Sequence, residues 1–342
     1  DAELLRRHVR KDTTVLLPDY PTDELERELA ALGFTTFLRT GNGEPVERDG
    51  LRIMITSLTG PSDGPIGDSA LSLDDGHTVL LNQNDAHPLD VDALRGFGEV
   101  HGYFTQFSGA IWWPMVYDLP EGAKKEFARR KRAGQSDRAL RYIDAVDAAH
   151  VFPTAGPPCF LDEELFDHNG LGRDGESIFT DQAEFLAELR AVRPGVSAHL
   201  LLPGSVAEFD GPRCELTHRH SAAEIERIFQ HKTAYLREYQ ARAQPALARE
   251  RVGRAPVPDD LLEQLKDWWE PLLKRAENIC VGVGGPVRLD VGERPLVIDF
   301  TAREVRDYAG EHCRYRLSTS ADLIATNLAR REVDWSNSLF LS

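Results

Sequence analysis

Two polar clusters in the first third of the chain carry residue types that bind metals or small ligands. The first cluster follows a short apolar, β-prone run and contains Asn82, Asn84, Asp85 and His87. Carboxylate and imidazole groups bind metals, and amides can orient a substrate. Asn and Asp also form Asx turns, and Pro88 suits the first turn of a helix. A ligand site and a structural turn both remain open interpretations.

The second cluster lies at the end of the β-prone run of residues 103–107. It contains Gln106 and Ser108, and Trp112 and Trp113 come shortly after it. Loops that follow buried strands often carry the residues of a binding site. The two tryptophans can stack on a nucleobase or sugar, or they can simply pack in the core.

The cysteines and remaining histidines show no familiar metal motif. Cys214 lies close in sequence to His218 and His220, but the spacing matches no common zinc site. A Rieske cluster needs two Cys-His pairs at short spacing. The four cysteines are scattered, and this chain has no such pairs.

Composition excludes some partners. The net charge of −16 and the pI of about 5.2 argue against nucleic acid and against anionic membranes, since both require a basic face. No apolar run has the length of a membrane span, so we expect no membrane insertion. Scattered cysteines favour a reducing, cytoplasmic location.

The periodicity of apolar residues predicts α/β structure. We expect a strand, a helix and a strand within residues 13–38, and then successive strands. Further helices are expected near residues 89–97, 140–146 and 182–192. The successive strands are predicted at residues 51–56, 69–73, 78–81 and 103–107.

The pattern changes after residue 205. Two long helical patterns follow, then strands near residues 295–300 and 313–317, and a last helix near 323–328. We therefore predict a first domain over residues 1–205 and a smaller α+β domain over residues 206–342.

Several stretches together resemble a known family. They are similar to the metallo-β-lactamase-fold part of actinobacterial Rieske-linked sugar hydroxylases, the UDP-N-acetylmuramate hydroxylases, which are relatives of CMP-N-acetylneuraminate hydroxylase. The stretches that carry the resemblance occur in the same order and are Gly64–Ser69, Asn82–Pro88, Phe104–Pro114, Ala155–Phe160, Arg294–Arg306 and Asp334–Ser342.

The resemblance implies a metallo-β-lactamase-like αββα sandwich that lacks its N-terminal strands. In such proteins a histidine-rich metal loop would precede Asp1, and a Rieske domain would follow Ser342. We therefore expect both ends to be cut from a longer protein. Residues 1–205 would be the sandwich, and residues 206–342 an accessory domain leading to the Rieske domain.

The resemblance also implies a cytoplasmic mono-oxygenase. It would hydroxylate the N-acetyl group of a nucleotide-linked amino sugar, a peptidoglycan precursor like UDP-N-acetylmuramate, to N-glycolyl. Its cofactors would be a mononuclear iron and a 2Fe-2S cluster outside this chain, with zinc as the alternative metal. An electron-donating reductase would be a partner.

Of the family's metal ligands, only the bridging aspartate carries over, onto Asp85. No catalytic residue is assigned. Residues expected to orient the substrate or the metal ligands are Asn82, Asn84, His87, Gln106, Ser108 and Trp112.

Two alternatives remain. The first is a metal-dependent hydrolase, which the absence of histidine near residues 58–63 and 154–156 puts in doubt. The second is a non-catalytic scaffold for the Rieske domain. With one assigned ligand and no cluster motif, we expect residues 1–342 alone to be inactive.

Overall fold

The structure of the protein is a computed structural model that describes residues 2–57, 67–88, 90–109, 112–170, 177–331 and 340–341. The chain divides into two compact units, each built from several stretches of sequence. The first unit comprises Asp1–Ala110, Arg132–Pro157 and Phe179–Phe229, and the second comprises Ile111–Lys131, Pro158–Ile178 and Gln230–Ser342.

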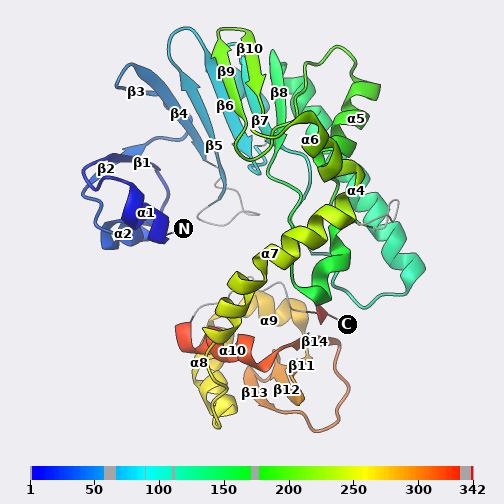
Figure 1. The fold of residues 1–342 in the computed structure, drawn as a ribbon. Helices are drawn as coiled ribbons and strands as arrows, with labels where there is room; N and C mark the ends of the chain where they lie inside the picture. The colour runs from blue at the N-terminus through cyan, green and yellow to red at the C-terminus, as the bar shows by residue number, and fades with distance from the viewer. Residues whose placement is uncertain are drawn as a thin grey trace. The chain divides into compact units, whose positions relative to one another are not determined.

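A six-stranded sheet forms the centre of the first unit, in the order β3-β4-β5-β6-β7-β8 (Figure 1). The first four strands are antiparallel neighbours, whereas β6, β7 and β8 run parallel. The carboxyl ends of these parallel strands therefore lie along one edge. The bounds are β3 Val46–Arg48, β4 Leu51–Ser57, β5 Ser69–Asp74, β6 Val79–Asn84, β7 Gly102–Gln106 and β8 His150–Thr154.

Helices cover one face of this sheet. Leu81, Tyr103 and Val151 point from neighbouring strands into a buried cluster with Ile143 and Phe185 of the helices. These helices are α4 (Glu121–Val146), whose first half belongs to the second unit, and α5 (Gln182–Val192); the short α3 (Val91–Arg95) links β6 to β7.

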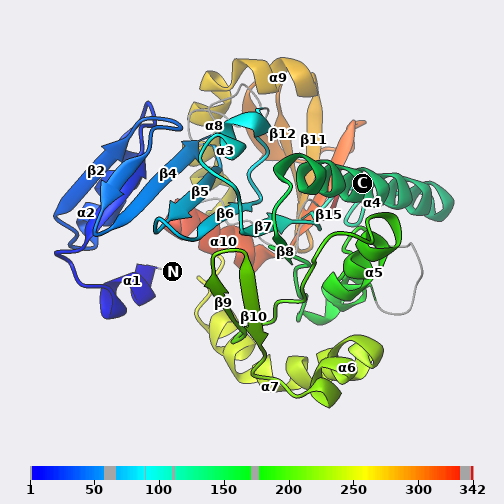
Figure 2. The same cartoon turned by 90° about the horizontal axis from the view of Figure 1, so that it is seen from above.

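A hairpin of β9 (Val206–Asp210) and β10 (Arg213–Thr217) lies against the opposite face (Figures 1 and 2). Phe209 packs edge-on against Phe152 of β8, with ring centroids 5.9 Å apart. A Cβ on Gly102 would come within 2.6 Å of the Phe209 ring, so only glycine fits at this crossing. Helix α6 (Ala222–Gln230) follows the hairpin.

The N-terminal segment forms a small β-α-β element. Helix α1 (Ala2–His8) precedes it, and β1 (Thr14–Pro18) pairs in parallel with β2 (Thr36–Thr40). Helix α2 (Glu24–Ala31) connects the two strands, as parallel pairing requires.

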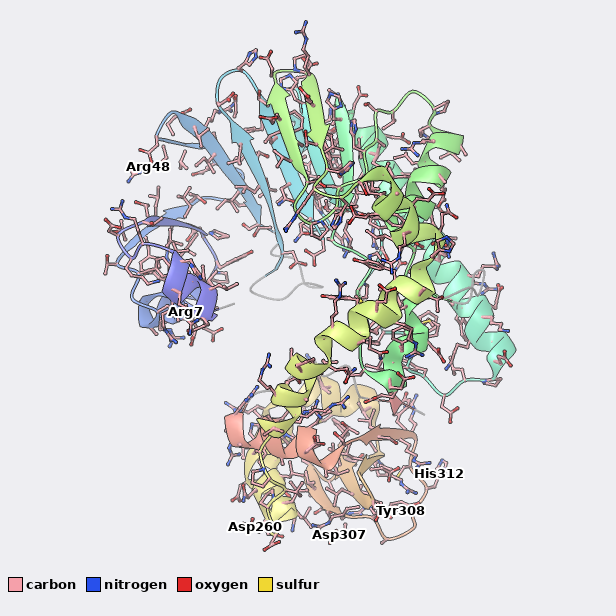
Figure 3. All side chains as sticks on the ribbon, viewed as in Figure 1. Arg7, Arg48, Asp260, Asp307, Tyr308 and His312 are labelled. Carbon is pink, nitrogen blue, oxygen red and sulfur yellow. The ribbon has the colours of Figure 1, made fainter. Side chains whose placement is uncertain are left out.

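The second unit contains a five-stranded sheet in the order β13-β12-β11-β14-β15. Leu289 and Leu296 of this sheet pack with Leu265 of α8 and Ile324 of α10 in a separate core. Asp307 ends the edge strand β13 and Tyr308 follows it; both are labelled in Figure 3. The Arg288 guanidinium lies 4.5 Å from the centroid of the Tyr308 ring. The unit's elements are the 3₁₀ helix η1 (Glu163–Asn169), α7 (Lys232–Val252), α8 (Leu261–Arg275), α9 (Glu277–Val283), β11 (Pro286–Val291), β12 (Arg294–Asp299), β13 (Glu304–Asp307), β14 (Tyr315–Thr319), α10 (Ala321–Arg330) and β15 (Phe340–Leu341).

The predicted α/β class with a smaller C-terminal α+β part is confirmed. The strand and helix order predicted between residues 51 and 107 is also confirmed. The hairpin of residues 206–217 was not predicted, and by its contacts it belongs to the first unit. A boundary between independently folding domains at residue 205 remains a prediction.

None of the helices that the structure describes is long and apolar enough to cross a membrane.

A buried polar side chain connects β6 to β7. Gln83 is almost fully buried, accepts a hydrogen bond from the Tyr103 hydroxyl and donates one to the Ala86 carbonyl at 2.8 Å. Burial raises the pKa of Tyr103 far above its ordinary value, so its hydroxyl remains a donor. The Gln83 amide thus fixes both the strand pair and the turn that follows β6.

We expect Gln83→Leu to lower the free energy of unfolding by about 3 kcal/mol, because a buried donor or acceptor left unpaired costs about 1–3 kcal/mol. Urea denaturation measures this loss. In the double variant with Tyr103→Phe, the loss should be smaller than the sum of the two single losses, because both partners are then apolar. Strictly additive losses would contradict the role assigned to this pair.

Candidate functional site

Asp85 lies in the turn directly after β6, at the edge where the parallel strands end. Asn84 adopts a left-handed backbone conformation with φ of 51°, and the pairing of β6 with β7 shifts register between Asn82 and Asn84. Asn tolerates this conformation better than most residues. The Ala86 amide donates to the Gln83 carbonyl at 3.0 Å and closes the turn. The turn interpretation of this stretch is therefore correct for the backbone, and the side chains of Asn82 and Asn84 remain exposed.

Charged and polar groups from four segments of the chain lie near His87. Gln106, at the end of β7, hydrogen-bonds its ring, and Arg138, Asp85 and Asp68 are near enough to influence its charge. Much of the residue is accessible, yet partial burial of the ring is the main cause that lowers the pKa of His87, followed by Arg138. Asp85, Asp68 and the Gln106 hydrogen bond act in the opposite direction. The lowered pKa favours the neutral imidazole at pH 7.

Arg138 and Tyr142 come from consecutive turns of α4. The Tyr142 hydroxyl donates to the Pro88 carbonyl at 3.2 Å, which holds this face of the helix against the loop after β6. Partial burial lowers the pKa of Arg138, but a guanidinium retains its charge at any physiological pH. Sequence reasoning missed Arg138 because nothing distinguishes it from the other bases on this helix.

Ser108 lies just beyond β7 and is almost fully buried. Among the atoms described, its Oγ has no hydrogen-bond partner. A Cβ on Gly156 would approach the Ser108 Cβ to 2.8 Å, so the two loops pack closely. The packing explains why residue 156 is glycine, and a role for Ser108 in ligand binding remains a prediction.

The two tryptophans belong to the second compact unit. The Trp112 ring is 5.0 Å from Phe160 and 6.4 Å from His168, and Trp113 is 5.1 Å from Phe127. Both side chains are partly buried and pack against aromatic rings in this structure. Stacking of Trp112 on a substrate ring remains a prediction.

The described residues do not assemble a metal centre of the expected kind. Over the parts of the chain that the structure describes, no group of three or more His, Cys, Asp or Glu side chains is placed to hold a metal ion. His218 hydrogen-bonds Ser205 at 2.9 Å, and Cys214 lies on β10. His101 accepts a hydrogen bond from the Val79 amide at the other end of the parallel strands, away from Asp85.

Neither implied cofactor fits these residues alone. A 2Fe-2S cluster of the Rieske type needs two cysteines and two histidines in short pairs, which this sequence lacks. A mononuclear iron needs several converging ligands, and the described site offers Asp85 and at most His87.

Comparisons with known proteins establish the family. The chain is 44% identical over its whole length to a Mycobacterium tuberculosis protein named as a Rieske 2Fe-2S iron-sulfur protein, Rv3818, and spans 68% of that protein. Residues 261–342 match the model of an Rv3818-like, SCP2-like domain. The chain belongs to this family of Rieske-named proteins.

Solved structures that are similar to this chain include CmlA, a diiron β-hydroxylase from Streptomyces venezuelae. It has a TM-score of 0.35 and 17% identity over 58% of this chain and 40% of that chain. The metallo-β-lactamase-fold protein YhfI from Bacillus subtilis has a TM-score of 0.35 and 11% identity, over 59% and 69% of the two chains.

Arg138→Gln should raise the pKa of His87, because it removes a positive charge that opposes protonation of the ring. Asp85→Asn should lower it. NMR titration of the His87 ring protons measures both shifts, and Arg141→Gln on the same helix is the matched control. An unchanged His87 pKa in Arg138→Gln would show that the two side chains do not interact.

The same shift makes folding stability depend on pH. Below about pH 6.5 the unfolded chain binds a proton at His87 before the folded chain does, so stability falls as the pH falls through the lowered pKa. Arg138→Gln should make this contribution smaller, which urea denaturation at several pH values would detect.

Proposed function

We propose that the protein carrying this chain is a Rieske-linked mono-oxygenase of the cytoplasm. It would hydroxylate the N-acetyl group of a nucleotide-linked amino sugar such as UDP-N-acetylmuramate, with electrons from a separate reductase. Identity of 44% over the whole chain to a Rieske-named protein is the observation that carries this proposal. The resemblance of residues 82–88 and 104–114 to the sugar hydroxylases supports the proposed substrate class.

In this proposal the loop after β6 is the part of the active site that this chain contributes. Asp85 would provide one carboxylate ligand to an iron ion, which supplies oxygen activation when bound. The remaining ligands would have to come from outside the residues that the structure describes. His87 is kept neutral by its surroundings and so remains available as a ligand or a proton acceptor.

Arg138 fits an anionic substrate. It is half-buried, and among the described residues no carboxylate forms an ion pair with it. A guanidinium binds phosphate oxygens through paired, charge-assisted hydrogen bonds. Gln106 and the exposed Asn82 and Asn84 add amide donors and acceptors for the sugar at the same edge.

A scaffold role is the second candidate, favoured by the absence of three converging ligands in the described part of the chain. In that case the loop after β6 would support the rest of the protein without contacting substrate.

An activity assay separates the two. The whole protein, with a chemical or enzymatic reductant and oxygen, should convert UDP-N-acetylmuramate to a product heavier by one oxygen atom, detected by mass spectrometry. Asp85→Asn should abolish the product, whereas the control Asp92→Asn at the exposed start of α3 should not. Arg138→Gln should raise KM about tenfold or more, since a charged hydrogen bond contributes about 1.5–3 kcal/mol. Full activity in Asp85→Asn would favour the scaffold.

A further inference from the structure

Two histidines and a serine meet on the hairpin face of the sheet, at the start of β8. Nδ1 of His150 lies 2.9 Å from Nε2 of His199. The Ser197 Oγ lies 3.3 Å from the first nitrogen and 3.2 Å from the second. Two nitrogen atoms and one oxygen atom, from two segments of the chain, thus form a nearly equilateral triangle.

Backbone pairing fixes the two segments. The Val151 amide donates to the Ser197 carbonyl, and the His199 amide donates to the Val151 carbonyl, both at 2.9 Å. The His199 ring also stacks on Phe152, with centroids 5.1 Å apart and planes inclined by 22°. Backbone hydrogen bonds therefore fix the two segments that carry these side chains relative to each other.

The hydrogen bonds of the His150 ring assign its protons. Nε2 of His150 lies 2.9 Å from the Pro212 carbonyl, which can only accept, so Nε2 carries the hydrogen. Nδ1 then carries a lone pair that accepts the hydrogen bond from Nε2 of His199. Metal-binding histidines have this arrangement, with one ring nitrogen on the metal and the other donating to a carbonyl.

His199 is also suited to donate a lone pair. In the absence of a metal, Nε2 of His199 donates its hydrogen to Nδ1 of His150 across the 2.9 Å contact. When a metal ion binds, that hydrogen would move to Nδ1 of His199, which gives the other neutral tautomer and frees the lone pair of Nε2.

We propose that Nδ1 of His150, Nε2 of His199 and Oγ of Ser197 form a binding site for a divalent transition-metal ion, zinc in the first place. Ligands around a tetrahedral zinc ion with bonds of about 2.0–2.1 Å lie roughly 3.3 Å apart, which is close to the separations in this triangle. Imidazole nitrogens suit zinc and copper, and water completes the shell. The net charge of −16 favours cation binding.

This site is separate from the loop after β6. His150 pairs with Gly102 at the start of β7, whereas Gln106 pairs with Thr154 four residues further on. Four residues at about 3.3 Å each place the two sites roughly 13 Å apart along the strands. The zinc ion would join β8 to the segment after α5 and, through Pro212, would support the β9–β10 hairpin. Its effect is on stability, independent of the proposed oxygenase activity.

Zinc titration of the untagged protein tests the site. Calorimetry with zinc chloride should show one site per chain, and zinc should raise the melting temperature because it binds only the folded state. His199→Phe keeps a ring against Phe152 but removes the nitrogen. It should weaken zinc binding at least about tenfold and abolish the rise in melting temperature. Circular dichroism without zinc checks that the variant is folded.

Two variants act as controls. His77→Gln removes a histidine that bonds Asp210 at the hairpin end, and Asp85→Ala removes the proposed ligand at the other site. Both should bind zinc as the unaltered protein does, and His150→Gln should not. The proposal is overturned if the unaltered protein binds no zinc, if His199→Phe binds zinc equally well, or if Asp85→Ala loses the binding.

Discussion

The buried amide of Gln83 is the interaction on which the candidate site depends. It joins β6 to β7 through the Tyr103 hydroxyl and closes the turn through the Ala86 carbonyl. An amide enclosed in an apolar core must satisfy its donors and acceptors, so these two hydrogen bonds stabilise the observed conformation of the turn. This turn contains the left-handed Asn84 and places Asp85 directly after β6.

The parallel pairing of β6, β7 and β8 explains why the two ends of the sheet differ chemically. Asp85, His87 and Gln106 lie at the carboxyl ends of β6 and β7, and Arg138 of α4 lies near His87. At the opposite ends, His101 accepts a hydrogen bond from the Val79 amide, and His150 donates one to the Pro212 carbonyl. In our proposals, an anionic substrate would bind at the first end and a structural cation at the second.

The strands around the site could be predicted from the sequence because their apolar runs are short and bounded by turn residues. Strands β5, β6 and β7 and helix α5 lie within a few residues of their predicted bounds. The Gln83 contact could not be predicted, because a glutamine within a polar run gives no sign that it faces the core. The β9–β10 hairpin was missed because its alternate residues are only partly buried and its apolar pattern is weak.

Contacts between residues far apart in the chain also could not be predicted from the sequence. His150 and His199 are 49 residues apart, and Arg138 and His87 meet only because α4 packs over the sheet. Such contacts depend on topology, which periodicity does not determine. The family resemblance identified Asp85 but gave no indication of its neighbours from α4.

Metal analysis of the whole protein tests most directly whether the loop after β6 belongs to an oxygenase centre. The account predicts a single iron ion in addition to the iron of the 2Fe-2S cluster. That ion should be lost in Asp85→Ala, while the electron paramagnetic resonance signal of the reduced cluster persists. Two zinc ions at this centre, no metal beyond the cluster, or iron that is retained in Asp85→Ala would contradict it.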